Sequence, residues 1–174
     1  MVVNLTLLLI IILLLIFLSM IWPPDSPWAP WWRTSDESIR RALKLAEVKS
    51  SDIVYDLGSG DGRVLIVAAK EFGASGVGIE IDPLRYFLST LMIYINKVSD
   101  RAVIKRKNFF DEDLSPATVV FLYLVPKALE RLRLKLLKEL KPGTRIVSIK
   151  YEIDLPVVKE SPYPGEYKIR LYKI

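Results

Sequence analysis

The chain has 174 residues, a net charge of +5, and neither histidine nor cysteine. Without these two residue types a disulfide framework, a thiol nucleophile and a serine–histidine–aspartate triad are excluded, and a structural zinc site is not expected. The length fits one domain behind an N-terminal segment of different composition.

The first 22 residues form that segment. The run from Leu5 to Trp22 has no charged residue and is apolar on every side. About 18 to 20 such residues cross the apolar layer of a bilayer, so residues 1–22 are predicted to be a transmembrane anchor with residues 5–22 in lipid. A cleaved signal peptide is the alternative, but this chain starts without Lys or Arg, has a longer apolar run and continues as Trp-Pro-Pro.

Residues 23–33 are predicted to be a linker rich in proline and tryptophan. Its four prolines should keep it stiff and extended, which would hold the following domain close to the membrane. Near the anchor, Lys and Arg occur only on its C-terminal side, as Arg33, Arg40 and Arg41. The positive-inside rule therefore places the domain in the cytoplasm.

Residues 34–174 alternate strand-like and helix-like segments. A first helix is expected from Thr34 or Ser35 to near Lys49. Strands are expected at 52–57, 76–81, 102–107, 118–123 and 144–151, with helices at 62–72, 83–99 and 126–140. Two last strands, 155–159 and 166–173, flank a proline–glycine turn and are expected to pair antiparallel. The pattern predicts an α/β domain with a Rossmann-like seven-stranded sheet and helices on both faces.

The stretch from residue 53 to 63 is the most informative. A short buried strand delivers Asp56, and glycines 58, 60 and 62 then lead into a helix. Because glycine has no Cβ, three glycines at alternate positions let the backbone approach a ligand closely. Their spacing differs from G-x-G-x-x-G, so the dinucleotide-binding fingerprint is not met.

A second acid, Glu80, ends the following strand, 24 residues after Asp56. A carboxylate at this place can accept hydrogen bonds from both hydroxyls of a ribose. The strings D-L-G-S-G-D-G-R and G-I-E-I-D-P resemble the first two motifs of the class I S-adenosylmethionine-dependent methyltransferases. The resemblance implies S-adenosylmethionine as cofactor. The cofactor-binding residues that it implies are Asp56, Gly58, Ser59, Gly60, Asp61, Gly62, Arg63, Glu80 and Ile81.

The residues after the third expected strand extend this resemblance. In the class, the pair at this place contacts the adenine, which implies that Asn108 hydrogen-bonds the base and Phe109 packs on it. Many members have aspartate where this chain has Asn108, although an amide still offers both a donor and an acceptor.

The end of the fourth strand narrows the resemblance. The string from Tyr123 to Pro126 lacks the [DNS]-P-P-[YF] motif of enzymes that methylate planar amide or base nitrogens, so these substrates are not expected. The chain resembles the archaeal protein-lysine methyltransferases and their membrane-anchored mitochondrial relatives, which also combine a transmembrane segment, an aromatic–proline segment and a minimal domain. Pro27-Trp28-Ala29-Pro30 with Thr34 stands where that family has Pro-aromatic-x-Pro-Thr.

Lysine methylation suits these residues. Only about 1 in 2,500 lysine amines is neutral at pH 7, and an apolar aromatic channel favours the neutral form without a histidine base. Tyr123 is the candidate catalytic residue, as a channel wall or an acceptor for the amine; a core residue at a strand end is the alternative. Pro126, Trp31 and Tyr151 are further candidate substrate contacts, and Trp31 equally suits the membrane interface.

The predicted function is a membrane-anchored protein-lysine N-methyltransferase, with a membrane-complex subunit as candidate substrate. Nucleic acid is not an expected partner, because no aromatic residues interleave the basic run between Lys127 and Arg145. No metal is expected. Two alternatives stay open: methylation of a lipid or other small molecule, and a non-catalytic cofactor-binding scaffold.

Overall fold

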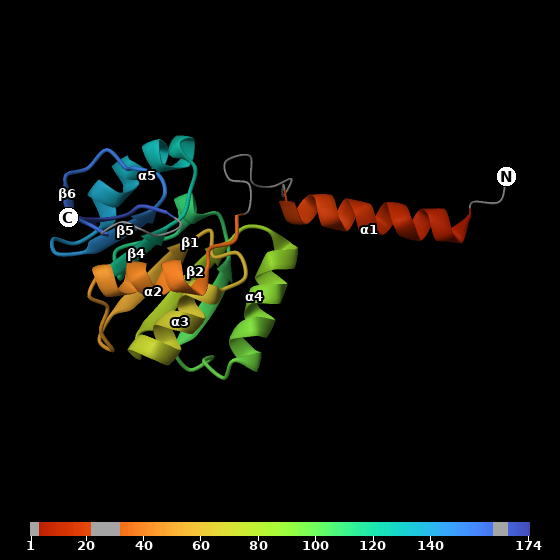
Figure 1. Ribbon diagram of the computed structural model, residues 1–174, viewed down its shortest axis with the longest axis horizontal. Coiled ribbons are helices and arrows are strands. Elements are labelled where there is room, and N and C mark those ends of the chain that lie inside the picture. The colour runs from red at the N-terminus through yellow and green to blue at the C-terminus, as the bar shows by residue number, and fades with distance from the viewer. Residues whose placement is uncertain (1–3, 22–31, 162–166) are drawn as a thin grey trace.

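A computed structural model describes residues 4–21, 32–161 and 167–174 (Figure 1). Most of the predicted linker, with Trp31, lies outside these ranges. The helices are α1 (Leu5–Ile21), α2 (Asp36–Leu45), α3 (Arg63–Phe72), α4 (Pro83–Ile95), the 3-10 turn η1 (Phe109–Asp111) and α5 (Pro126–Glu139). The strands are β1 (Ile53–Leu57), β2 (Ser75–Glu80), β3 (Ala102–Arg106), β4 (Val119–Leu122), β5 (Arg145–Ile149), β6 (Val157–Glu160) and β7 (Ile169–Lys173).

Helix α1 is apolar, and its side chains from Leu5 to Leu18 are exposed. Within the described ranges, no helix combines the length and the apolar character that crossing a membrane requires.

The seven strands form one sheet in the order β3-β2-β1-β4-β5-β7-β6. The first five are parallel, and β7 runs antiparallel to both β5 and β6. This confirms the predicted seven-stranded sheet with an antiparallel last pair. The chain order reverses between β1 and β4, and in such sheets a ligand crevice opens at the carboxyl ends of the strands on either side of the reversal.

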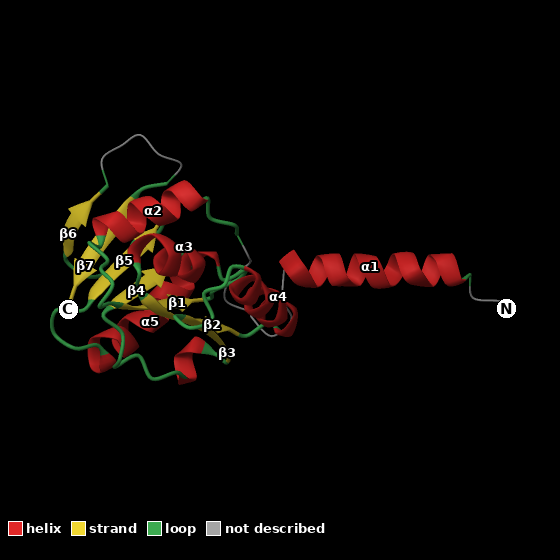
Figure 2. Cartoon of the chain, turned by 90° about the horizontal axis from the view of Figure 1, so that it is seen from below, coloured by secondary structure: helices red, strands yellow, loops and turns green. Residues whose placement is uncertain are grey.

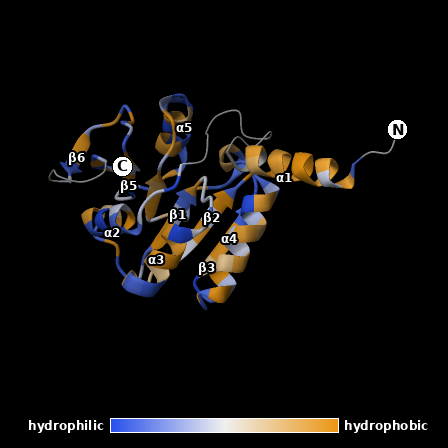
Figure 3. Cartoon of the chain, turned by 45° about the vertical axis from the view of Figure 1, so that its right-hand side comes forward, coloured by the Kyte–Doolittle hydropathy of each residue, from blue (hydrophilic) through white to orange (hydrophobic). Residues whose placement is uncertain are grey.

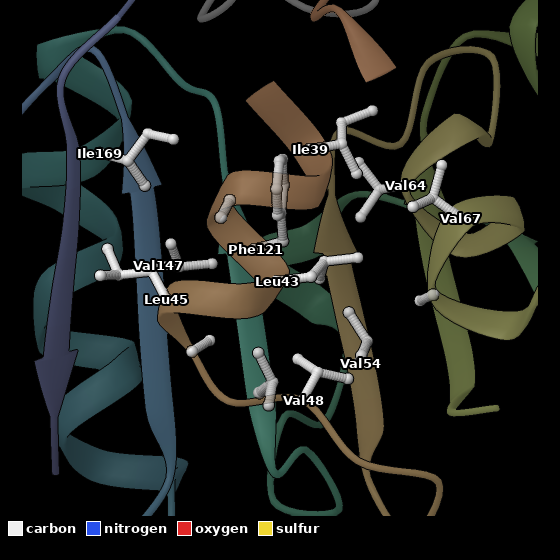
Figure 4. Close-up of a cluster of buried hydrophobic side chains, with 14 of the residues drawn as sticks. Ile39, Leu43, Leu45, Val48, Val54, Val64, Val67, Phe121, Val147 and Ile169 are labelled. Atoms are coloured by element: carbon white, nitrogen blue, oxygen red, sulfur yellow. The ribbon is translucent and has the colours of Figure 1, made fainter. Parts of the chain in front are cut away.

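Helices cover both faces of the sheet (Figure 2). On one face, Ile39 and Leu43 of α2 pack with Val54 of β1 and Phe121 of β4 (Figure 4). The opposite side chains of β1, beginning with Tyr55, pack against α5. This alternation along one strand is what a sheet buried on both sides requires.

Three elements end at least two residues earlier than the sequence predicts. Helix α2 stops at Leu45 rather than near residue 49, α4 at Ile95 rather than 99, and β5 at Ile149 rather than 151. The chain leaves each one at a non-glycine residue with a left-handed backbone, namely Glu47 (φ 51°), Lys97 (φ 58°) and Lys150 (φ 71°). A left-handed residue can continue neither a right-handed helix nor a strand.

Candidate functional site

The turn between β1 and α3 depends on its glycines. Gly58, Gly60 and Gly62 have φ values of 85°, 54° and 75°, and a side-chain-bearing residue in this region costs about 1–2 kcal/mol. At Gly62 there is also little room, since a Cβ would lie 3.2 Å from the Cβ of Ser89. The three glycines therefore shape the backbone itself, as the motif predicted.

The same turn is fastened to the end of β2. The backbone N–H groups of Gly58 and Ser59 both donate to the carbonyl of Ile79, at 2.9 and 3.0 Å. The N–H of Gly60 donates to Oε2 of Glu80 at 2.8 Å. The turn and the end of β2 are thus held together by three hydrogen bonds.

Glu80 has a second role that the motif did not reveal. Its Oε1 accepts from the N–H of Asp82 at 3.0 Å, so the buried carboxylate joins the glycine turn to the start of α4. Burial raises the pKa of Glu80, against the lowering effect of these two hydrogen bonds. Each carboxylate oxygen has a further lone pair, so binding of ribose hydroxyls stays a prediction.

Asp56 is the most unusual charge of the site. It is 4% exposed, and its carboxylate forms no hydrogen bond or ion pair with any described residue. Burial, and then the neighbouring carboxylates of Asp61 and Glu80, raise its pKa well above the ordinary 3.8. Burial without a cationic partner disfavours the ionised form of a carboxylate, and a bound cationic ligand would stabilise that form.

Ser59 and Gly78 are fitted to one another. The hydroxyl oxygen of Ser59 is buried and lacks a hydrogen-bond partner among the described residues. A Cβ on Gly78 would lie only 2.8 Å from both the Cβ and the Oγ of Ser59. Because Gly78 of β2 has no side chain, there is space for Ser59 of the glycine turn to pack against the strand.

These groups line one pocket at the carboxyl ends of β1, β2 and β4. Ten predicted site residues line it: Asp56, Gly58, Ser59, Gly60, Asp61, Arg63, Glu80, Ile81, Phe109 and Tyr123. Four do not: Gly62 caps α3, Pro126 begins α5, Asn108 accepts from the N–H of Phe110 at 3.1 Å and caps η1, and Tyr151 lies just past β5. The roles assigned to individual residues remain predictions.

Two residues of the motif, Asp61 and Arg63, form ion pairs with other parts of the chain. Arg63 pairs with Asp36 of α2 at 3.0 Å and with Asp61 at 3.3 Å. Asp61 also pairs with Arg33, which precedes α2, at 3.3 Å. These contacts connect the glycine turn to the segment that enters the domain, a function that the motif alone does not indicate.

The sequence missed several residues of the pocket. Trp32 and Thr34 reach it from the segment before α2, Leu124 from the end of β4, and Arg85 from α4. Burial lowers the pKa of the Arg85 guanidinium, while Glu80 and Asp82 act to raise it. Thr34 and Leu124 lie in strings that the sequence had singled out by resemblance, whereas no motif marks Trp32 and Arg85 as pocket residues, because they reach the pocket through the tertiary fold.

The pocket fits S-adenosylmethionine by its chemistry. That cofactor carries a sulfonium and an ammonium, both cationic, and the pocket contains the uncompensated carboxylate of Asp56. It also carries a flat adenine, and Phe109 with Ile81 offers an apolar surface. The glycine turn leaves backbone space that side chains would otherwise fill.

Comparisons with known proteins agree with this geometry. Residues 56–158 match the ANTKMT methyltransferase domain. The chain is 47% identical over 135 residues to a protein-lysine N-methyltransferase of Saccharolobus islandicus, which covers 77% of this chain and 82% of that protein. It is 29% identical over 124 residues to the adenine nucleotide translocase lysine N-methyltransferase of Mus musculus, covering 71% of this chain and only 54% of that relative.

A solved structure is also similar. An RNA methyltransferase from Salinibacter ruber, in complex with S-adenosyl-L-homocysteine, superimposes with a TM-score of 0.80 at 37% identity, covering 82% of this chain and 94% of that one. Together these likenesses confirm the predicted class and its methyl donor. The chain belongs to the ANTKMT methyltransferase domain family.

Proposed function

We propose that this protein transfers a methyl group from S-adenosylmethionine to lysine side chains of another protein. The observation that carries the proposal is a single pocket in which buried carboxylates meet an aromatic wall. Asp56 and Glu80 line it together with Trp32 and Tyr123. The relative at 47% identity, a protein-lysine N-methyltransferase, supports the same substrate class.

The residues suit the chemistry of this transfer. When bound, S-adenosylmethionine supplies an electrophilic methyl carbon on a sulfonium. Asp56 would hold the cationic part of the cofactor and Glu80 its ribose, while Phe109 would pack on the base. Trp32 and Tyr123 would exclude water from the lysine amine, whose pKa falls in apolar surroundings, and the proton leaves to solvent before the lone pair attacks. Positioning of the neutral amine then supplies most of the acceleration.

A labelling experiment tests the proposal. The full chain in detergent is incubated with methyl-labelled cofactor and a membrane extract, and labelled residues are located by mass spectrometry. We expect label on lysine, lost in Asp56→Ala and retained in Asp100→Ala, which alters an exposed acid paired with Arg101. Label found in lipid or in RNA would show that the substrate is not a protein. Cofactor binding without any labelled product would indicate a non-catalytic scaffold.

We propose further that α1 anchors the chain in a membrane, with the domain on the cytoplasmic side. Its 17 residues would extend about 25 Å, which alone is short of the roughly 30 Å apolar layer, although the uncharged run in the sequence continues to Trp22. A second surface supports this placement: Phe87, Leu91 and Tyr94, at helical spacing on α4, are 63%, 41% and 74% exposed. Figure 3 shows that much of α4 has the colour of hydrophobic residues. A site near the bilayer would suit a component of a membrane complex as substrate.

A charge placed in α1 tests the anchor. Leu13→Arg should release the protein from sedimented membranes, because a charge at the centre of a membrane helix costs about 2.5–3.5 kcal/mol. Leu134→Arg alters a leucine on α5 that is 68% exposed, against 56% for Leu13, and should leave the protein with the membranes. Equal sedimentation of both variants would contradict the anchor, and protease treatment of intact cells would test its orientation.

A further inference from the structure

Three aromatic rings surround the side-chain amine of Lys150. Its Nζ lies 5.1 Å from the ring centroid of Tyr151, 5.3 Å from that of Tyr167 and 5.7 Å from that of Trp32. A cation within about 6 Å of a ring centroid is attracted by the negative face of the ring. We call these three rings the aromatic cage.

The cage is assembled from distant parts of the chain. Trp32 precedes α2, Tyr151 follows β5, and Tyr167 precedes β7. Rings that converge on one ammonium from three segments form a site that depends on the complete fold. None of the described carboxylates pairs with Lys150, so within the described chain the rings are what its charge meets.

The cage adjoins the pocket. Trp32 belongs to both, because it lines the pocket and faces Lys150. The ring of Tyr167 lies 5.7 Å from the ring of Tyr123, which also lines the pocket. A cation leaving the cage toward Tyr123 would therefore pass along aromatic side chains.

The backbone of Lys150 is held in an unfavourable conformation. Its φ of 71° is left-handed, although glycine or asparagine would fit there more easily. Its N–H donates to the carbonyl of Lys168 at 2.8 Å, and the hydroxyl of Ser148 donates to the carbonyl of Tyr151 at 2.7 Å. A strained residue that its surroundings keep in place is a reason to look for a function.

We infer that the aromatic cage is the docking site for the ammonium of a substrate lysine, and that Lys150 fills it until a substrate arrives. The inference rests on the proposed function and adds a competitor built into the chain. A substrate lysine would displace Lys150, bind the cage as a cation, and lose its proton to solvent before its neutral amine enters the pocket beside Tyr123.

Direct binding tests the cage without any methyl transfer. The full chain in detergent is titrated with n-butylammonium, which has the end of a lysine side chain, and binding is followed by nuclear magnetic resonance. Lys150→Ala should bind this probe about fivefold more tightly than wild type, because the cage is vacant. Lys97→Ala is the matched control, since Lys97 is also exposed and left-handed, and it should bind as wild type does.

Two further measurements sharpen the titration. Trp32→Leu combined with Lys150→Ala should lose the gain, and neutral 1-butanol should show none in any variant. Equal binding of n-butylammonium by wild type and Lys150→Ala, or equal binding of both probes, would overturn the cage.

Kinetics test the competition. In Lys150→Ala the KM for a lysine-containing substrate should fall about threefold to tenfold, while the KM for S-adenosylmethionine stays unchanged. Lys150→Arg should keep the wild-type KM, because a guanidinium also stacks on aromatic rings. A KM that is unchanged or higher in Lys150→Ala would refute the competition. Absence of methyl transfer in every variant would instead refute the proposed function. The titration would still show whether the aromatic cage binds an ammonium group.

Discussion

Replacing Gly78 by alanine should damage the fold and the site together. A Cβ at this position would lie 2.7 Å from Cδ1 of Ile104 and 2.8 Å from the Cβ and the Oγ of Ser59. Real Cβ atoms essentially never approach so closely, so a neighbour must shift. Gly78 is not among the left-handed glycines, so only space forbids the alanine.

The loss of stability in Gly78→Ala depends on whether Ile104 and Ser59 can move away from the new Cβ atom. The end of the Ile104 side chain can rotate. Ser59 cannot move freely, because its N–H is bonded to the carbonyl of Ile79. Overpacking costs about 1–3 kcal/mol, and with one fixed neighbour we expect a loss of about 2–3 kcal/mol in the free energy of unfolding. For a chain of this size this lowers the melting temperature by roughly 4–12 °C.

Denaturant unfolding followed by circular dichroism measures this loss. Gly143→Ala is the control: no atom lies within 4 Å of its Cβ position, so only its left-handed φ of 92° contributes, about 1–2 kcal/mol. Ile104→Val removes the Cδ1 atom and should restore part of the stability of Gly78→Ala, although it costs about 0.5–1.5 kcal/mol alone.

The affinity for S-adenosylmethionine should fall as well, because the displaced Ser59 belongs to the glycine turn. A Gly78→Ala chain within about 0.5 kcal/mol of wild type would refute the steric reasoning. Strict additivity of Gly78→Ala with Ile104→Val would refute it equally, because additivity is expected only of sites that do not touch.

Three further predictions concern single side chains. Because the folded chain raises the pKa of Asp56, this group stabilises the cofactor-free fold fully below its unfolded pKa and loses that effect as pH rises through the folded value. Asp56→Asn should therefore flatten the decline of stability above about pH 4 while abolishing cofactor binding in calorimetry; an unchanged pH slope contradicts this. Glu80→Gln places an amide NH2 group where the N–H of Gly60 or of Asp82 now donates, so the free energy of unfolding in denaturant should fall by about 1–3 kcal/mol. An unchanged free energy of unfolding would argue that Glu80 does not stabilise the glycine turn. Phe87→Ser should weaken co-flotation with anionic liposomes, unlike Leu134→Ser, and identical flotation would leave α4 without a membrane role.

The sheet was predictable because its signals are local. Short apolar strands, a proline at the start of α4 and α5, and the antiparallel final pair all follow from neighbouring residues. The ends of α2, α4 and β5 were not predictable in the same way. One or two residues after each end, a charged residue takes the left-handed conformation, at a place where a glycine would have indicated the end from the sequence.

The same distinction between local sequence signals and tertiary contacts applies to the residues of the site. The glycine turn, Asp56 and Glu80 are contiguous with recognisable strands, so the sequence alone indicates that they lie near one another, and they do line one pocket; their contacts with the cofactor stay predictions. Arg85 reaches the pocket from α4, and no motif marks it. Trp32 lines the pocket from the segment before α2, where the sequence had instead singled out its neighbour Trp31. Asn108, predicted from the class to contact the base, uses its side-chain oxygen to accept from the N–H of Phe110 and so caps η1.

The ion pairs between the glycine turn and the entering segment make the turn sensitive to what precedes the domain. Their side chains are 27% to 63% exposed, so each pair is weak and salt screens it, yet Asp61 belongs to two of them. A shortened chain that begins at residue 34 would lose Arg33 and one of the two charges that neutralise Asp61. Cofactor affinities measured on such a fragment, or at high ionic strength, would describe a looser turn than that of the whole protein.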